Sequence, residues 1–148
     1  MVDEFKAMTS RRSRLIWLWL LTLLFLLRVI GQLLVVCCRV SWLPPMSHWY
    51  SGLLPYPILF PTQLIILALQ TKINIDWAEQ VRWFARPHHR FGNGLQWFSY
   101  GYASVMAVRY VLTMTVYPER RWFGEGTIPI IFHVVLAAYV YLWGQAHR

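Results

Sequence analysis

Arg28 and Arg109 lie within stretches of the chain that are otherwise apolar enough to cross a membrane. An ionised side chain in hydrocarbon costs at least about 2.5–3.5 kcal/mol, so an arginine inside a membrane span marks a functional site by default. The guanidinium group can bind a phosphate or a carboxylate through two parallel hydrogen bonds. The two arginines therefore predict a binding site for an anion inside a membrane protein.

The composition of the chain agrees with a membrane location. Of the 148 residues 57% are hydrophobic and 14% are charged, and the mean hydropathy is +0.41. A net charge of +8 would suggest nucleic acid as the partner of a soluble protein, but here most basic residues lie between and outside the apolar runs. In those positions they act as topology determinants, so we expect no nucleic-acid partner.

Four segments are apolar over nearly the length of about 20 residues that a helix needs to cross the hydrocarbon core. They comprise residues 15–36, 55–71, 95–116 and 128–144. The first is too long for the apolar part of a signal peptide and no small-residue cleavage site follows it, so we expect it to remain in the mature protein. The prediction is an all-α integral membrane protein, a four-transmembrane-helix bundle that forms a single domain over residues 1–148.

The distribution of lysine and arginine predicts the orientation of the bundle, because positive charge is retained on the cytoplasmic side. Nine of these residues lie in the N-terminal tail, the loop between the second and third spans, and the C-terminus, whereas three lie in the other two loops. The nine are Lys6, Arg11, Arg12, Arg14, Lys72, Arg82, Arg86, Arg90 and Arg148. We therefore expect both termini to face the cytoplasm, in a plasma or inner membrane.

Two loops are predicted to be structured. The cytoplasmic loop carries Trp77, Val81 and Phe84 at helical spacing after an acidic capping-box pair, which predicts a short interfacial helix at residues 76–85. The alternative is that this loop only joins the second and third spans. The outer loop at residues 41–56 is rich in proline and aromatic residues, which is typical of an ordered aromatic lid rather than a flexible linker.

Every predicted span contributes a polar side chain to one layer in the outer half of the bilayer. Counted inward at about 1.5 Å per residue, five polar residues come out roughly 6–12 Å deep. These residues are Arg28, Gln32, Gln63, Arg109 and His133. Four further residues could support the layer, namely Tyr102, Glu119, Arg120 and Arg121. We therefore expect a basic polar pocket that binds an anion or a lipid headgroup.

The charge balance of this layer points to a ligand. The predicted spans contain no carboxylate that could neutralise the two guanidinium groups, and the nearest ones, Glu119 and Glu125, lie in the outer loop. The missing anion would then be a phosphate, a carboxylate or an acidic lipid headgroup. The alternative is purely structural, since polar residues hydrogen-bond between helices and long arginines can reach the outer headgroups.

Other chemistry has weaker support in the sequence. Cys37 and Cys38 could bind a soft metal, but adjacent helical residues point about 100° apart, and the chain has no further cysteine. His133 and His48 could be axial ligands of a haem, but His48 lies in a loop outside the spans. Phosphate-binding loops, zinc-protease motifs and nucleophile elbows are absent from the sequence. We therefore predict no metal site and assign no cofactor.

Three functions fit these residues. The first is an accessory, lipid- or quinone-binding subunit that packs beside a protein partner or further copies of itself among membrane lipids. The second is a small membrane enzyme acting on an anionic lipid or isoprenoid phosphate, with the arginines as an anion clamp and His133 or Glu119 as the acid–base group. The third is an oligomeric small-solute transporter. The first is favoured because catalysis and proton-coupled transport need a second acid–base group. The predicted spans contain a single histidine and no carboxylate.

Overall fold

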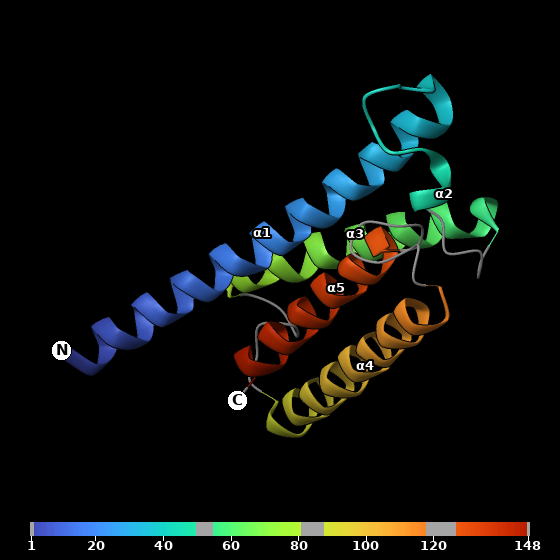
Figure 1. Ribbon diagram of the computed structural model, residues 1–148. Coiled ribbons are helices and arrows are strands. Elements are labelled where there is room, and N and C mark those ends of the chain that lie inside the picture. Colours follow the sequence, from blue (N-terminus) through green and yellow to red (C-terminus); the bar gives the residue numbers. More distant parts are fainter. Residues whose placement is uncertain (1, 50–54, 81–87, 118–126, 148) are drawn as a thin grey trace.

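The computed structural model describes residues 2–49, 55–80, 88–117 and 127–147, and these residues form helices without any strand. The helices are α1 (Val2–Cys38), α2 (Met46–Trp49), α3 (Tyr56–Glu79), α4 (His89–Val116) and α5 (Thr127–Ala146) (Figure 1). The prediction of an all-α protein is therefore confirmed.

Three of these helices are long and apolar enough to cross a membrane. They are the segments Ser10–Cys38, Tyr56–Glu79 and Ile128–Ala146. Helix α4 is also long, but polar residues such as Ser99, Tyr102 and Arg109 occur along its length, and it is not apolar enough to be one of the three. The fold is that of a small helical membrane protein with three candidate spanning helices among the described residues. The predicted bundle of four transmembrane helices is not confirmed, because α4 is not one of the three.

Helix α3 extends well beyond the predicted end of the second span. It continues beyond residue 71 to Glu79 and ends where Gln80 adopts a left-handed backbone conformation, with φ 57°. The prediction that a separate interfacial helix starts at residue 76 is therefore wrong. Lys72 and Asp76 lie one turn apart and pair at 3.2 Å, a spacing that stabilises the continuous helix. Residues 81–85 of the predicted interfacial helix lie outside the described residues.

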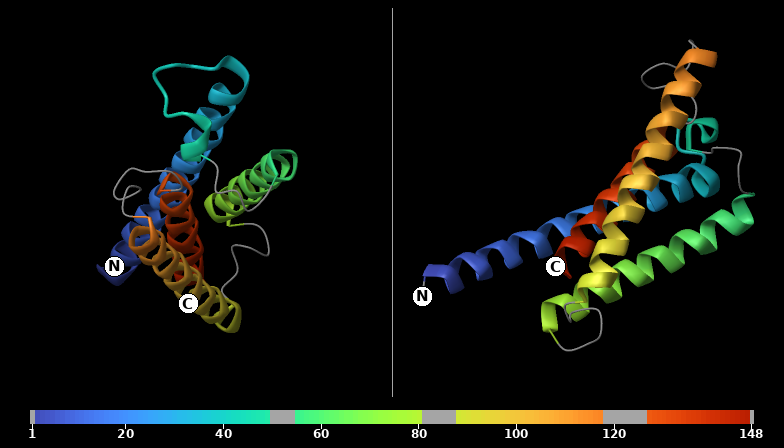
Figure 2. Two further views of the ribbon diagram at one scale, coloured as in Figure 1. Left: turned by 45° about the vertical axis from the view of Figure 1, so that its right-hand side comes forward. Right: turned by 90° about the horizontal axis from the view of Figure 1, so that it is seen from below.

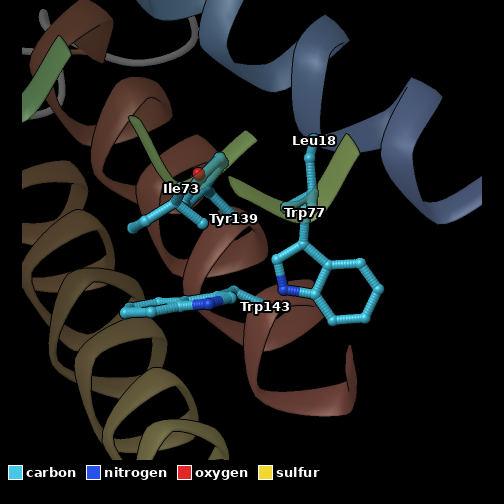
Figure 3. Close-up of a cluster of buried hydrophobic side chains, with 5 residues drawn as sticks. All are labelled: Leu18, Ile73, Trp77, Tyr139 and Trp143. Carbon is cyan, nitrogen blue, oxygen red and sulfur yellow. The ribbon is translucent and has the colours of Figure 1, made fainter. Parts of the chain in front are cut away.

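Helix α5 lies between α1 and α4 and packs against both, while α3 packs against α1 (Figures 1 and 2). Near the C-terminal ends of α3 and α5, five side chains form the main apolar core (Figure 3). They are Leu18, Ile73, Trp77, Tyr139 and Trp143. Many large apolar side chains on the outer faces of the helices are exposed, as expected for surfaces that contact lipid.

Two glycines allow α4 and α5 to approach closely. A Cβ atom added to Gly92 would lie 2.8 Å from the carbonyl oxygen of Gly144, and one added to Gly144 would lie 2.9 Å from that of Gly92. Further along the pair, the Ser99 hydroxyl donates a hydrogen bond to the Ala137 carbonyl at 2.7 Å. The two helices are thus antiparallel, and this register brings Tyr102 of α4 opposite α5.

Candidate functional site

A cavity of about 140 Å³ lies among the four long helices, beside Trp49 of α2. Its polar lining consists of Arg28, Thr62, Gln63, Tyr102 and His133, and the rest of its wall is apolar or aromatic. The structure therefore brings together Arg28, Gln63 and His133, three of the five residues predicted for the polar pocket. It also places the supporting residue Tyr102 in the same wall.

Arg28 is the only charged residue that lines this cavity among the described residues. Its side chain is buried, with 7% of the residue exposed, and the guanidinium carbon lies 5.5 Å from the centroid of the Phe132 ring. Its Nε atom has no hydrogen-bond partner, and no carboxylate pairs with it, within the part of the chain that the structure describes. The cavity therefore contains a buried cation held over an aromatic face, an arrangement that favours an anion beside it.

Gln32 contacts a residue of the cavity wall. It does not line the cavity, but its Oε1 atom accepts a hydrogen bond of 3.1 Å from Nε2 of Gln63, which does. Both residues are buried, and among the described residues Gln32 Nε2 and Gln63 Oε1 have no hydrogen-bond partner. The pair therefore fixes Gln63 at the cavity wall and keeps unused hydrogen-bonding capacity there.

Tyr102 and His133 form the second polar feature of the cavity. The Tyr102 hydroxyl and Nδ1 of His133 are hydrogen-bonded, and the two rings meet edge to face with centroids 5.7 Å apart. Either group can carry the shared proton, because the direction of the bond depends on the histidine tautomer. The pair is therefore a proton donor and acceptor held in a fixed position beside Arg28.

Arg109 does not share the position of Arg28. It is partly exposed and does not line the cavity, and it lies about 10 Å along α4 from Tyr102, which does, at roughly 1.5 Å per residue. The structure thus places one arginine in the cavity wall and the other nearby. Glu119, Arg120, Arg121 and Glu125 lie outside the described residues.

The part of the outer loop that the structure describes contributes Trp49 to the cavity wall. Trp49 is buried, and its indole Nε1 donates a hydrogen bond of 2.9 Å to the Pro44 carbonyl. The ring packs on Gly31 so closely that a Cβ atom there would lie 2.7 Å from Cη2 of Trp49. Helix α1 therefore carries a glycine at the position where the loop tryptophan covers the site.

A second polar network, which was not predicted from the sequence, lies closer to the C-terminal ends of α3 and α5. Asn74 Nδ2 donates to Thr22 Oγ1 at 3.0 Å, and the Tyr139 hydroxyl donates to Asn74 Oδ1 at 2.9 Å. All three side chains are buried. The available signal was the helical spacing of Asn74 from Gln63 and Gln70, but the predicted second span ended before Asn74. This network joins α1, α3 and α5 through hydrogen bonds and has a structural role.

The expectation that no carboxylate lies within the spans is also wrong, because the longer α3 includes Asp76. This residue is buried, with 3% exposed, and its carboxylate pairs with Lys72. Asp76 lies about 20 Å along the helix from Gln63, at roughly 1.5 Å per residue. It is therefore too far away to neutralise Arg28 in the cavity.

The described residues contain no group of three or more His, Cys, Asp or Glu side chains that could hold a metal ion. Cys37 and Cys38 are exposed at the end of α1. His48 does not line the cavity that contains His133.

Comparisons with protein-family models, with curated proteins and with solved structures find no match to this chain. The fold and the cavity define the class to which it belongs: small helical membrane proteins with a buried arginine at an internal cavity. What such a protein binds depends on the chemistry of its cavity.

Proposed function

We propose that the protein is an accessory membrane subunit that binds the polar head of a lipid or quinone in the cavity containing Arg28. The observation that carries the proposal is the buried guanidinium group, which lines a cavity and has no carboxylate partner among the described residues. A buried charge of this kind is stabilised by a bound anion or by a strong hydrogen-bond acceptor.

The size of the cavity limits what it can accept. An apolar cavity of about 150 Å³ holds one benzene molecule. The cavity at Arg28, with a volume of about 140 Å³, therefore fits a carboxylate, a phosphate or the ring of a quinone, but not a whole lipid. The rest of an amphiphile must lie outside the cavity, within the membrane or against a protein partner.

Native mass spectrometry of the protein purified in mild detergent tests this proposal. The probes are oleate, lysophosphatidate and a short-chain ubiquinone, and the uncharged oleyl alcohol serves as the control for the oleate chain. We expect the protein to retain at least one of the three probes in preference to the alcohol. Equal retention of all four molecules would contradict a head-specific site.

We also propose that α4 is a fourth membrane span, with both termini in the cytoplasm of a plasma or inner membrane. The support is that α4 runs antiparallel to the candidate span α5, from the contact of Gly92 with Gly144 to that of Tyr102 with His133. At the opposite end of α1 from the cavity, Arg11 and Arg14 donate hydrogen bonds to carbonyl groups of Trp77 and Gln145, near the C-terminal ends of α3 and α5. Basic residues are thus grouped with the C-terminus at one end of the bundle.

Reporter fusions test this topology. A reporter placed after Arg148 and one inserted within residues 124–127 should report opposite sides of the membrane, with the C-terminal reporter in the cytoplasm. The reason is the excess of basic residues in the predicted cytoplasmic segments. A C-terminus outside the cytoplasm would contradict the orientation, and reporters on the same side would contradict the final span.

A second candidate function is a membrane enzyme acting on an anionic lipid or isoprenoid phosphate. The observation that favours it is the hydrogen-bonded pair of Tyr102 and His133 in the wall that also contains Arg28. Such a pair could move a proton while the guanidinium group holds the oxyanion. Turnover of a polyprenyl phosphate by the purified protein, lost in Tyr102→Phe, would support the enzyme over the subunit.

A further inference from the structure

An apolar groove of about 350 Å³ runs between α3 and α4, with α5 as its floor. Helices α3 and α4 lie on different sides of α5 and are not packed directly against each other (Figure 2). The walls include Leu69 of α3 and Phe98 of α4, and Val140 of α5 lies in the floor. Leu69 and Phe98 are exposed, with 47% and 61% of each residue accessible, so the groove is open to the surroundings of the bundle.

The groove adjoins the cavity at Arg28. Ile66, Tyr102 and Leu136 line both spaces, and these three residues come from α3, α4 and α5 respectively. A molecule whose head occupies the cavity would reach the groove by passing between these three side chains.

The length and volume of the groove suit one hydrocarbon chain. It extends along α3 from Ile66 to Ile73, about 10 Å at 1.5 Å per residue, away from the arginine and toward the apolar core. Its volume is roughly twice that of a cavity that holds benzene, which leaves room for one chain segment but not for two side by side. In the proposed topology this direction leads from the middle of the bilayer into its cytoplasmic half.

We propose that the ligand is a single-tailed anionic amphiphile, with its oxyanion head beside Arg28 and its tail in the groove between α3 and α4. This inference rests on the proposed function and specifies its ligand. The head is an oxyanion because Arg28 supplies a buried positive charge, and carboxylates and phosphates share this chemistry. The tail is in the groove because the two spaces share three wall residues and the second is almost wholly apolar.

A matched pair of substitutions on α3 tests the position of the tail. Leu69 lines the groove and Leu64 does not, yet their exposed fractions are 47% and 46%. Tryptophan at position 69 fills the groove, so Leu69→Trp should weaken retention of oleate and of lysophosphatidate by about tenfold. Leu64→Trp should retain both as the wild type does, and hexanoate, which has too little chain to fill the groove, should bind both variants equally.

The outcomes separate this inference from the proposed function. If Leu69→Trp and Leu64→Trp retain oleate equally, while hexanoate binds the wild type, the tail does not lie in the groove and the head site stands. If the wild type retains no anionic probe, the proposed anion site itself fails. Preference for the two-tailed phosphatidate over lysophosphatidate would overturn the single-tailed ligand.

A measurement on the wild-type protein covers the case in which Leu69→Trp does not fold. A fatty acid with a photoreactive diazirine near the middle of its chain should crosslink to Leu69 or Phe98, and fragmentation of the crosslinked peptide identifies the modified residue. Crosslinks confined to outward-facing residues such as Ile65 or Val108, which do not line the groove, would overturn the inference. Oleate and lysophosphatidate, tested as competitors, distinguish a carboxylate ligand from a phosphate ligand.

Discussion

Arg28→Gln should lose most of the protein's retention of an anionic amphiphile while the helices remain assembled. Glutamine keeps hydrogen-bonding capacity but removes the buried positive charge from the cavity wall. A hydrogen bond to a charged group contributes about 1.5–3 kcal/mol, so we expect retention to fall roughly tenfold to a hundredfold. Native mass spectrometry with oleate and lysophosphatidate measures the loss, and thermal unfolding in detergent checks that the variant is folded.

Three further arginine variants act as controls. Arg28→Lys should restore retention only in part, because lysine lacks the planar guanidinium group that makes two parallel hydrogen bonds. Arg109→Gln should have a smaller effect, since Arg109 is partly exposed and does not line the cavity. Arg12 is exposed at the other end of α1, so Arg12→Gln should have no effect. Equal retention by all four variants would leave only a structural role for Arg28.

Part of this site could be predicted because the fixed rise of a helix per residue converts a position within an apolar run into a depth in the membrane. Arg28, Gln63 and His133 come from three segments far apart in the sequence, but each was counted from the end of an apolar run, and the three line one cavity. Arg109 was counted in the same way and does not line it. Depth does not determine how far a helix is rotated about its axis, and packing against neighbouring helices sets that rotation.

The errors at the end of the second span have a common physical cause. The second span was ended near residue 71 because the residues that follow are polar, but Lys72 and Asp76 pair with each other and Asn74 hydrogen-bonds to Thr22 and Tyr139. Polar residues that satisfy one another can continue a helix beyond the limit that hydropathy predicts. The groove between α3 and α4 was also beyond prediction, because it depends on which helices pack together.

The packing of α4 against α5 leads to the second large expected effect. Gly144→Ala should destabilise the bundle by about 1–3 kcal/mol, because the added methyl group meets the Gly92 carbonyl oxygen at 2.9 Å and the backbone must move to make room. Gly92→Ala should act in the same way, since its methyl group meets the Gly144 carbonyl oxygen at 2.8 Å. Thermal unfolding in detergent measures the effect as a lower midpoint temperature.

Gly101 provides the matched control on α4, because a Cβ atom there meets nothing within 4 Å. Gly101→Ala should be neutral or stabilising, by up to about 1 kcal/mol, since alanine has the higher helix propensity. Separation of α4 from α5 should also weaken the hydrogen bond between Tyr102 and His133, so Gly144→Ala should retain less amphiphile than Gly101→Ala. If both variants unfold at the same temperature, the close approach of the two helices is not what holds α4 in place. Other contacts would then have to hold Tyr102 in the wall of the cavity.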